Sequence, residues 1–271
     1  ERSTPHSYRV KVNEFLVKLE KFAKIGNNNN YNYKQRAKTL AKRMEEIALH
    51  MNFGVLYDKK RHHLYIGYDY SKGRFSESYY DMLMSEARLT SYVAMAKGDV
   101  EAEHFSHLAR RYGEDGKVLL SWSGTLFEYV LPELFMPSPY GSALYDSIFE
   151  MLKIQMDARA GRPWGVSESG YNDYDDNLNY KYKAFGLKSL AVKRMEGDDN
   201  VVAPYASIMA SNHLPQNVYE NMEKMTKLGV EGKYGYYEAI DYTPGSKGIV
   251  ESFMAHHVGM ALCGMANLLF D

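Results

Sequence analysis

The chain has 271 residues, 45% of them apolar and 25% charged, which is enough apolar material for a buried core and excludes wholesale disorder. Its 33 basic and 34 acidic residues give a formal net charge of −1, so no overall positive field exists to attract a nucleic acid or an anionic membrane. We therefore expect neither nucleic acid nor direct membrane contact, and no stretch approaches the ~20 apolar residues that span a bilayer. The single cysteine, Cys263, excludes a disulfide framework and is expected to be a small buried apolar residue.

Apolar residues recur at intervals of three and four along most of the chain, as they do in amphipathic helices. The helices predicted in this way span residues 8–24, 33–51, 76–97, 99–111, 123–134, 141–159, 201–211, 215–228 and 250–270. Residues 54–70 change to short apolar runs on either side of a charged turn, a pattern that predicts a β-hairpin. We expect strand structure to end there, and the fold to be mainly α in a single domain over residues 1–271.

Two long segments, residues 161–182 and 229–248, are rich in Gly, Asp, Asn and Tyr and are predicted as loops. Loops longer than about 12 to 15 residues are usually functional or disordered. The chain holds 24 tyrosines, where roughly 8 to 10 would be ordinary, and ten of them lie between Tyr171 and Tyr242. A tyrosine on a Gly-rich loop offers a ligand both a flat face and a hydroxyl, so these loops are candidate binding segments.

Glu86 is the first candidate catalytic residue. On the predicted helix 76–97 it shares a face with apolar residues such as Leu83 and Val93. Such a face would desolvate the carboxylate, which raises the carboxyl pKa and suits a general acid. The alternative is a buried structural glutamate that pairs with Arg88 or with an arginine of another helix.

Glu168 lies in a loop shaped by glycines and a proline, between Trp164 and Tyr171. Glycines permit close approach of the backbone to a ligand, and the aromatic rings offer flat faces beside the carboxylate. The alternative is a helix-terminal cap formed with Ser167 or Ser169.

Glu238 and Asp241 occupy a similar setting, among Tyr236, Tyr237 and Tyr242 in the second predicted loop. Two acids amid tyrosines could bind sugar hydroxyls, or they could only order the loop. The sequence leaves both interpretations open.

Glu128 and Trp122 belong to one short segment before the predicted helix 123–134. Glu128 follows Thr125 by three residues, the spacing of a capping box, and this structural role is favoured over a catalytic one. Trp122, next to Gly124, is a candidate stacking platform for a ligand.

The histidines give little support for a metal site. His104 and His107 have helical spacing but lie among charged residues, which predicts a solvated face. Adjacent residues on a helix point about 100° apart, so His256 and His257 do not easily share one metal. No glycine-rich nucleotide motif is present, and we expect neither a metal nor another cofactor.

A helical scaffold whose Gly-rich loops carry Trp, Tyr and acidic residues fits a carbohydrate best. Sugar C–H faces pack on aromatic rings, sugar hydroxyls bind carboxylates and arginine, and glycosyl transfer uses two carboxylates. Seven motifs then make a family recognisable: Tyr79–Leu89, Ser121–Tyr129, Pro163–Tyr171, Tyr182–Gly186, Val201–Tyr205, Tyr234–Pro244 and Met254–Met260. In this order, from about Asn52 to Asp271, they resemble the central region of bacterial cyclic β-1,2-glucan synthases and the wider glucoamylase-like group that includes β-1,2-glucanases.

The resemblance implies an (α/α)6 toroid. A complete ring needs more helices than are predicted here, so the toroid is expected to be incomplete at its N-terminal side. It also implies that the chain is a fragment of a larger, membrane-anchored parent on the cytoplasmic side of the bacterial inner membrane. In that parent the segment lies between a glycosyltransferase module and a phosphorylase-like module, and the fragment itself is expected to be soluble.

The resemblance also assigns roles to residues. Glu86 in its Ser-Glu-Ala-Arg motif resembles the acid/base, Glu168 in Ser-Glu-Ser resembles the nucleophile, and Glu238 is the reserve. The residues expected to bind the substrate are Arg88, Trp122, Trp164, Tyr171, Tyr237, Asp241, Tyr242 and His256.

The implied activity is a retaining transglycosylation that cyclises linear β-1,2-glucan. Two alternatives remain, an inverting endo-β-1,2-glucanase and a non-catalytic glucan-binding or structural fragment.

Overall fold

The computed structural model describes residues 33–194 and 199–270. The chain divides into two compact units, residues 1–52 and 53–271. In the first unit, helix α2 (Tyr33–His50) agrees with the helix predicted over residues 33–51, and all of its residues are exposed. The helix predicted over residues 8–24 lies outside the described residues. The expectation of a single domain stays a prediction.

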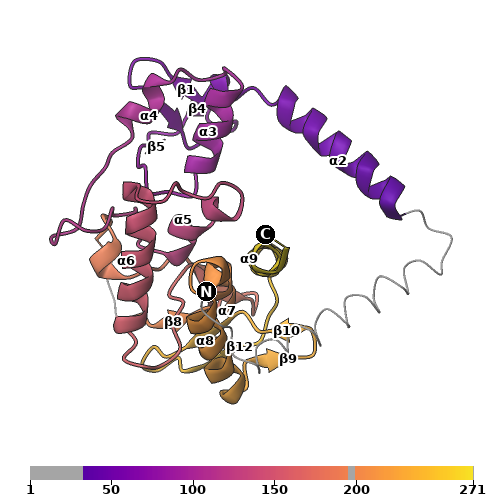
Figure 1. The fold of residues 1–271 in the computed structure, drawn as a ribbon, viewed down its shortest axis with the longest axis vertical. Coiled ribbons are helices and arrows are strands. Elements are labelled where there is room, and N and C mark those ends of the chain that lie inside the picture. The colour runs from indigo at the N-terminus through magenta and orange to yellow at the C-terminus, as the bar shows by residue number, and fades with distance from the viewer. Residues whose placement is uncertain (1–32, 195–198, 271) are drawn as a thin grey trace. The chain divides into compact units, whose positions relative to one another are not determined.

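The second unit begins with short antiparallel strands followed by two helices (Figure 1). These elements are η1 (Phe53–Leu56), β1 (Tyr57–Asp58), β2 (His63–Tyr65), β3 (Tyr68–Asp69), β4 (Arg74–Phe75), β5 (Tyr79–Tyr80), α3 (Arg88–Ala96) and α4 (Glu103–His107). Strand β2 pairs with both β1 and β5, and β3 pairs with β4, so the predicted hairpin near residues 54–70 is present.

The helix predicted over residues 76–97 is wrong in its first half. Residues Tyr79 and Tyr80 form β5, which pairs with β2, and Met82 forms a bridge to Ala109. Helix α3 begins only at Arg88, and no side chain caps it. The apolar residues of this segment therefore meet neighbours from distant parts of the chain, and that tertiary pairing overrides the local helical pattern.

Helices α5 to α9 make the main body of this unit (Figure 1). They and the short 3-10 turns among them are α5 (Leu126–Val130), η2 (Pro132–Leu134), α6 (Ala143–Asp157), η3 (Lys188–Leu190), α7 (Pro204–Met209), η4 (Ala210–Asn212), α8 (Pro215–Lys227) and α9 (Ala255–Phe270). Prolines at the first positions of α7 and α8 suit helix starts, because the missing N–H has no partner there. The predicted helices 123–134, 141–159, 201–211, 215–228 and 250–270 are confirmed, with shorter ends.

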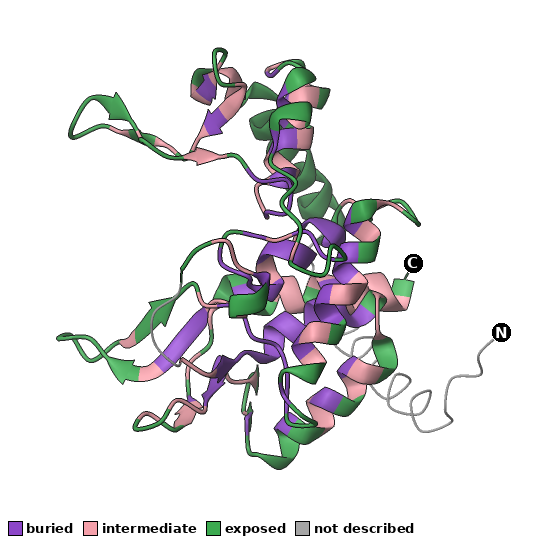
Figure 2. Ribbon diagram, turned by 90° about the vertical axis from the view of Figure 1, so that its left-hand side faces the viewer, coloured by how far each residue is buried: buried purple, intermediate pink, exposed green. Residues whose placement is uncertain are grey.

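The hydrophobic core lies where these helices meet (Figure 2). Helix α7 is buried along its whole length and packs against α5, α8 and α9. The core includes Leu126, Tyr129, Ile148, Leu152 and Met209, and the Tyr129 hydroxyl donates to the Leu119 carbonyl at 2.7 Å. This core fixes α5 and α7, which carry residues around the candidate site.

Strands also occur after residue 70, so the expectation that strand structure ends there is wrong. In or at the edges of the two predicted loops lie β6 (Ser169–Tyr174), β7 (Tyr180–Lys183), β9 (Glu231–Gly232), β10 (Gly235–Tyr236), β11 (Ala239–Asp241) and β12 (Gly248–Val250). Strand β8 (Val201–Val202) replaces the first residues of the helix predicted over 201–211. Strand β11 lies between β8 and β12, and β6 pairs with β7. These strands are too short to show a clear alternation in the sequence, and they exist because of pairing between distant segments.

Two glycines allow the loops at the site to touch. A side chain at Gly186 would collide with the backbone of Ser123 and Gly124. Gly124 itself has φ +67°, and a side chain there would collide with the Leu187 carbonyl. The segment after β7 therefore packs directly on the segment before α5.

The described residues thus form a mainly helical protein with small sheets. None of the helices in this described part has the length and apolar character needed to cross a membrane.

Candidate active site

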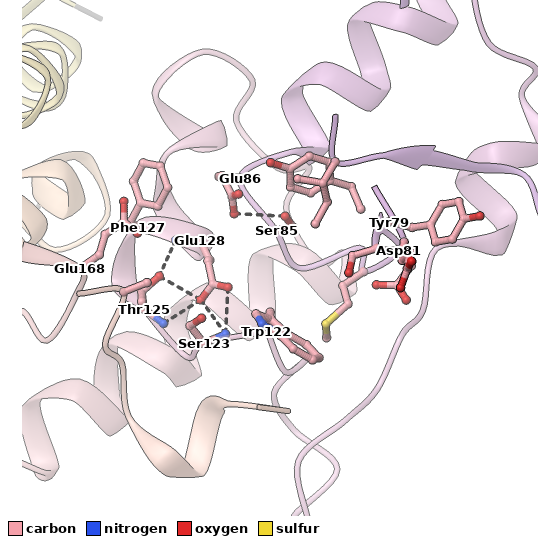
Figure 3. A pocket seen from close by; sticks show the side chains of 16 residues that line it. Tyr79, Asp81, Ser85, Glu86, Trp122, Ser123, Thr125, Phe127, Glu128 and Glu168 are labelled. Atoms are coloured by element: carbon pink, nitrogen blue, oxygen red, sulfur yellow. Dashed lines mark hydrogen bonds between the residues drawn. The ribbon is translucent and has the colours of Figure 1, made fainter. Parts of the chain in front are cut away.

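A cavity of about 440 Å³ lies between the turn after β5, the segment that starts α5, and the residues before β6. Its lining residues are Ile66, Glu77, Ser78, Tyr79, Tyr80, Asp81, Met82, Ser85, Glu86, Trp122, Ser123, Thr125, Phe127, Glu128, Glu168 and Ala184. Figure 3 shows Glu86, Glu128 and Glu168 toward one end of the cavity, with Tyr79 and Asp81 toward the other. Segments far apart in the sequence thus bring three carboxyl groups to one hollow.

Glu86 lies in the turn before α3 rather than on a helix. Burial raises the pKa of its carboxyl, and the neighbouring carboxyl groups of Glu128 and Glu168 raise it further. The opposing donors are its own backbone and the Ser85 hydroxyl, which donates to Oε2 at 3.1 Å. The direction of this shift is the one predicted, although it comes from the cavity wall and not from a helix face.

Arg88 does not pair with Glu86. Its guanidinium is buried and donates to Glu133 Oε1 at 2.9 Å, and the two side chains are each 2% exposed. Ser138 also donates to both oxygens of Glu133. Arg88 is therefore part of a buried ion pair and not of the cavity surface, which corrects its assignment to substrate binding.

Glu168 immediately precedes β6, so the alternative of a helix-terminal cap does not apply to it. Burial raises the pKa of its carboxyl, while a hydrogen bond from Tyr182 and the charge of His257 act in the opposite direction. The Tyr205 hydroxyl donates to the Glu168 backbone carbonyl at 2.8 Å and so holds the main chain. Glu168 therefore combines a desolvated position with fixed donors to its anionic form.

Glu128 is also in the cavity wall, but its oxygens are already occupied. Oε2 accepts from the Ser121 hydroxyl at 2.8 Å and from both the backbone and the hydroxyl of Thr125 at 2.9 Å. Oε1 accepts from the Ser123 backbone at 2.9 Å. The capping box with Thr125 is confirmed, and these bonds give the carboxylate a structural role.

Trp122 lines the same cavity and is 55% exposed. An exposed indole beside two carboxyl groups is a suitable face for the C–H side of a sugar ring. Trp122, Glu86 and Glu168 are thus the sequence-predicted residues that the structure brings together.

Glu238 does not line this cavity. It faces a second hollow of about 190 Å³, together with Tyr237, Phe253 and His257. Its carboxylate is buried and accepts from the Gly170 backbone at 3.1 Å and from His257 Nδ1 at 2.9 Å. The reserve catalytic residue therefore supports the structure between β6 and α9.

Of the two adjacent histidines on α9, His257 is buried and His256 is exposed, and the role of His256 in substrate binding stays a prediction. Helix geometry carried a signal for His257, since His257 and the buried Gly264 are seven residues apart and share a face. Tyr182 and Tyr205, which hold Glu168, were not singled out because a single tyrosine among 24 carries no mark of its role.

The other predicted binding residues do not reach the larger cavity. Trp164 is buried in the main core, and Asp241 is buried, where it accepts from the backbone of Asn172 at 3.1 Å. Tyr171 is buried with the Lys183 ammonium 4.6 Å from its ring centroid. The Arg159 guanidinium lies 4.9 Å from the ring centroid of Tyr242. Their surroundings are those of structural residues.

His104 corrects the expectation of a solvated face on α4. It is fully buried, with Nδ1 2.7 Å from the His62 carbonyl and Nε2 2.9 Å from the Ser91 hydroxyl, and burial lowers its pKa. Cys263 is half-buried on α9 and not fully buried as expected. Within residues 33–194 and 199–270, no group of three or more His, Cys, Asp or Glu side chains could hold a metal ion.

Comparison with known proteins gives this fold and site a class. Residues 155–271 match the Glycoamylase family, described as "Putative glucoamylase". The chain is also 39% identical over 248 residues to the cyclic beta-(1,2)-glucan synthase NdvB of Rhizobium meliloti (strain 1021), a match that covers 88% of this chain. The predicted resemblance is therefore confirmed, and residues 155–271 carry the match to the glucoamylase family. More narrowly, the chain is similar to part of a cyclic β-(1,2)-glucan synthase, of whose length it spans 9%.

Solved structures share the fold. The endo-beta-1,2-glucanase of Chitinophaga pinensis, in complex with sophorotriose and glucose, matches with a TM-score of 0.60 at 17% identity, over 89% of this chain and 60% of that one. The beta-1,2-glucanase of Parabacteroides distasonis matches with a TM-score of 0.55 at 15% identity, over 89% of this chain and 39% of that one. At such identities the likeness concerns the fold alone.

Proposed function

We propose that this chain is a carbohydrate-active domain that acts on β-1,2-glucan by retaining transglycosylation, with Glu168 as nucleophile and Glu86 as acid/base. The observation that carries the proposal is the single cavity that holds Glu86, Glu168 and the exposed indole of Trp122. The substrate class rests on the similarity to the glucan synthase, because the synthase is the relative with substantial sequence identity.

The two glutamates differ in a way that suits these roles. Glu86 has the Ser85 hydroxyl as its side-chain donor, and burial and two neighbouring carboxyl groups raise its pKa, so it holds a proton for the leaving oxygen. Glu168 is also desolvated, but Tyr182 and His257 favour its ionised form, which is the form that attacks an anomeric carbon. Two carboxyl groups of one cavity whose donors differ in this way suit an acid and a nucleophile.

The reaction has two steps. Glu168 attacks the anomeric carbon while Glu86 gives its proton to the leaving glycosidic oxygen, which forms a glycosyl ester on Glu168. Glu86, now a carboxylate, then takes the proton of an incoming sugar hydroxyl, whose oxygen displaces Glu168. If the incoming hydroxyl belongs to the same glucan chain, the product is a ring.

We also propose that the helices form part of an (α/α)6 toroid. The mainly helical body and the shared fold with glucanases support this architecture. The chain covers 60% of the Chitinophaga glucanase and 9% of the synthase, which supports further helices and further modules, glycosyltransferase and phosphorylase-like, in a longer parent.

The test is incubation of linear β-1,2-glucan with the protein and with Glu168→Gln, followed by mass spectrometry of the products. We expect cyclic or rearranged glucan from the unchanged protein and a loss of about 10⁴-fold or more in Glu168→Gln. Glu114→Gln, an exposed carboxylate outside the cavity, is the matched control and should keep full activity. Equal activity in Glu168→Gln and the unchanged protein would remove Glu168 from the mechanism.

The second candidate is an inverting endo-β-1,2-glucanase, favoured by the solved glucanases that share the fold. In that reaction a carboxylate activates water, and the first product has the α configuration. Binding of the glucan without any turnover would instead support a non-catalytic glucan-binding fragment.

A further inference from the structure

A row of hydrogen-bonded side chains connects Glu238 on the far side of β6 to the candidate nucleophile. Glu238 holds His257, whose Nδ1 lies 2.9 and 3.0 Å from the two carboxylate oxygens, and both side chains are 2% exposed. His257 Nε2 lies 3.3 Å from the Tyr182 hydroxyl. The same hydroxyl is hydrogen-bonded to the Glu168 carboxyl. Each member therefore contacts the next, from Glu238 to Glu168.

The surrounding packing fixes this row in place. The Tyr205 ring stacks on the imidazole of His257, with centroids 3.7 Å apart and planes at 10°. The Tyr205 hydroxyl donates to the Glu168 carbonyl, so one tyrosine contacts both His257 and the main chain of Glu168. Gly170 packs against Glu238, because a side chain there would lie 3.2 Å from Glu238 Cγ.

The number of protons in the row is tied to the charge of Glu168. The Tyr182 hydroxyl carries one proton and cannot donate to Glu168 and to His257 at once. If it donates to an ionised Glu168, the bond to His257 needs a proton on Nε2, and the bond to Glu238 needs a proton on Nδ1. The direction of the donors along the row therefore depends on whether Glu168 accepts from Tyr182.

When Glu168 becomes an ester, its carboxyl group no longer needs the proton of the Tyr182 hydroxyl. The ester oxygen is a weaker acceptor, and the Tyr182 hydroxyl can then turn its proton toward His257 Nε2. The rotatable Tyr182 hydroxyl therefore suits the Glu168 carboxyl, which must be an anion before the attack and must leave as an anion in the second step.

From this arrangement we propose that Glu238, His257 and Tyr182 form a positioning relay that holds the Glu168 carboxylate in its ionised form and in one orientation. The relay rests on the proposed function for its purpose, but its existence can be tested without turnover. None of its three members lines the cavity that holds Glu86, Trp122 and Glu168, so these three residues act through Glu168 and not on the sugar.

The test is the titration of the Glu168 carboxyl by ¹³C NMR in the full chain, with Glu168→Gln used to assign its signal. The titratable groups around Glu168 are Glu86, Glu128, Tyr182, Tyr205, Glu238 and His257. Tyr182→Phe removes one hydroxyl from a side chain that is 41% exposed, so the fold should persist. We expect the Glu168 titration to move to higher pH in this variant.

Tyr180→Phe is the matched control, because Tyr180 lies on the same strand and contacts Tyr174 rather than the relay. It should leave the titration of Glu168 where it is. Glu238 also raises the pKa of Glu168 directly through its charge, so the effect of Glu238→Gln on the titration is measured with and without the Tyr182 hydroxyl. The relay predicts that this effect changes when Glu238→Gln is combined with Tyr182→Phe.

An unchanged Glu168 titration in Tyr182→Phe overturns the proposal. An equal shift on Glu238→Gln with and without the Tyr182 hydroxyl would also overturn it, since Glu238 would then act only through its charge. If the protein turns over glucan, Tyr182→Phe should lower kcat about 10- to 100-fold with KM within about twofold, the effect of losing one hydrogen bond to a charged group. If no turnover occurs but the NMR shift does, the proposed function fails and the relay stands.

Discussion

Glu128 and Glu168 line one cavity, and their environments are opposite. Glu128 accepts from the backbone or hydroxyl groups of Ser121, Ser123 and Thr125, which occupy both of its oxygens. Glu168 has one tyrosine donor from the side, and burial raises its pKa. A carboxylate in a cavity is therefore available for chemistry only if hydrogen bonds from the protein do not already occupy its oxygens.

Glu86 belongs with Glu168 on the available side of this comparison, and its replacement should have the largest effect after that of Glu168→Gln. Glu86→Gln removes the proton that the leaving oxygen needs, and we expect kcat to fall about 10²- to 10⁴-fold. With an aryl β-sophoroside, whose phenolate leaving group needs no proton, the rate of the first step, attack by Glu168, should be largely restored. A variant that is equally slow with both substrates would contradict the role of Glu86 as an acid.

Glu128→Gln should act on stability instead. Gln places an amide against donors that the carboxylate now accepts, and we expect a loss of about 2 kcal/mol in the free energy of unfolding, measured by urea denaturation. Because the Glu128 charge raises the pKa values of Glu86 and Glu168, the pH profile of the folded variant should move toward lower pH while its maximal kcat is kept. A large loss of kcat without a loss of stability would reverse the roles of Glu128 and Glu168.

Trp122→Ala should change binding and leave the fold intact. The indole is 55% exposed, so its removal costs little core packing. Loss of a stacking face should raise KM for linear β-1,2-glucan about five- to tenfold, with kcat nearly unchanged. Calorimetry with Glu168→Gln as the background would measure the same loss without turnover, and unchanged binding would contradict the platform.

The smallest expected effect is on the pH dependence of stability. Burial raises the pKa values of Glu86 and Glu168 above those of the unfolded chain, so both groups bind a proton more tightly in the folded state. Their contribution to stability is present at low pH and is lost as pH rises through the raised pKa values. Thermal unfolding should therefore show a higher Tm for Glu86→Gln than for the unchanged protein at pH values above the raised pKa values, and no difference at lower pH.

Much of the helical body could be predicted from the sequence, because α6, α8 and α9 bury one face along several turns and their apolar residues repeat at helical spacing. The segment before Arg88 could not, because its apolar residues pair with β2 and with Ala109, which are distant in sequence. The same limit hides β8 and β11, where pairing of Val202 with Ile240 decides the structure.

The residues of the candidate site also divide into those that the sequence could predict and those that it could not. Glu86, Glu168 and Trp122 lie in motifs whose composition marked them, and the structure brings them to one cavity. Arg88 and Asp241 are charged residues in motifs of the same kind, but each is buried with protein partners, Glu133 for Arg88 and Asn172 for Asp241. A sequence lists acceptors and donors, and only the fold decides which of them satisfy each other.

The configuration of the first product tests the central claim most directly. Linear β-1,2-glucan would be incubated with the protein, and the anomeric signals of new reducing ends or new linkages would be followed by ¹H NMR before mutarotation. Attack by Glu168 followed by a second displacement predicts product of the β configuration from the first minutes. Product that first appears in the α configuration would contradict a covalent role for Glu168.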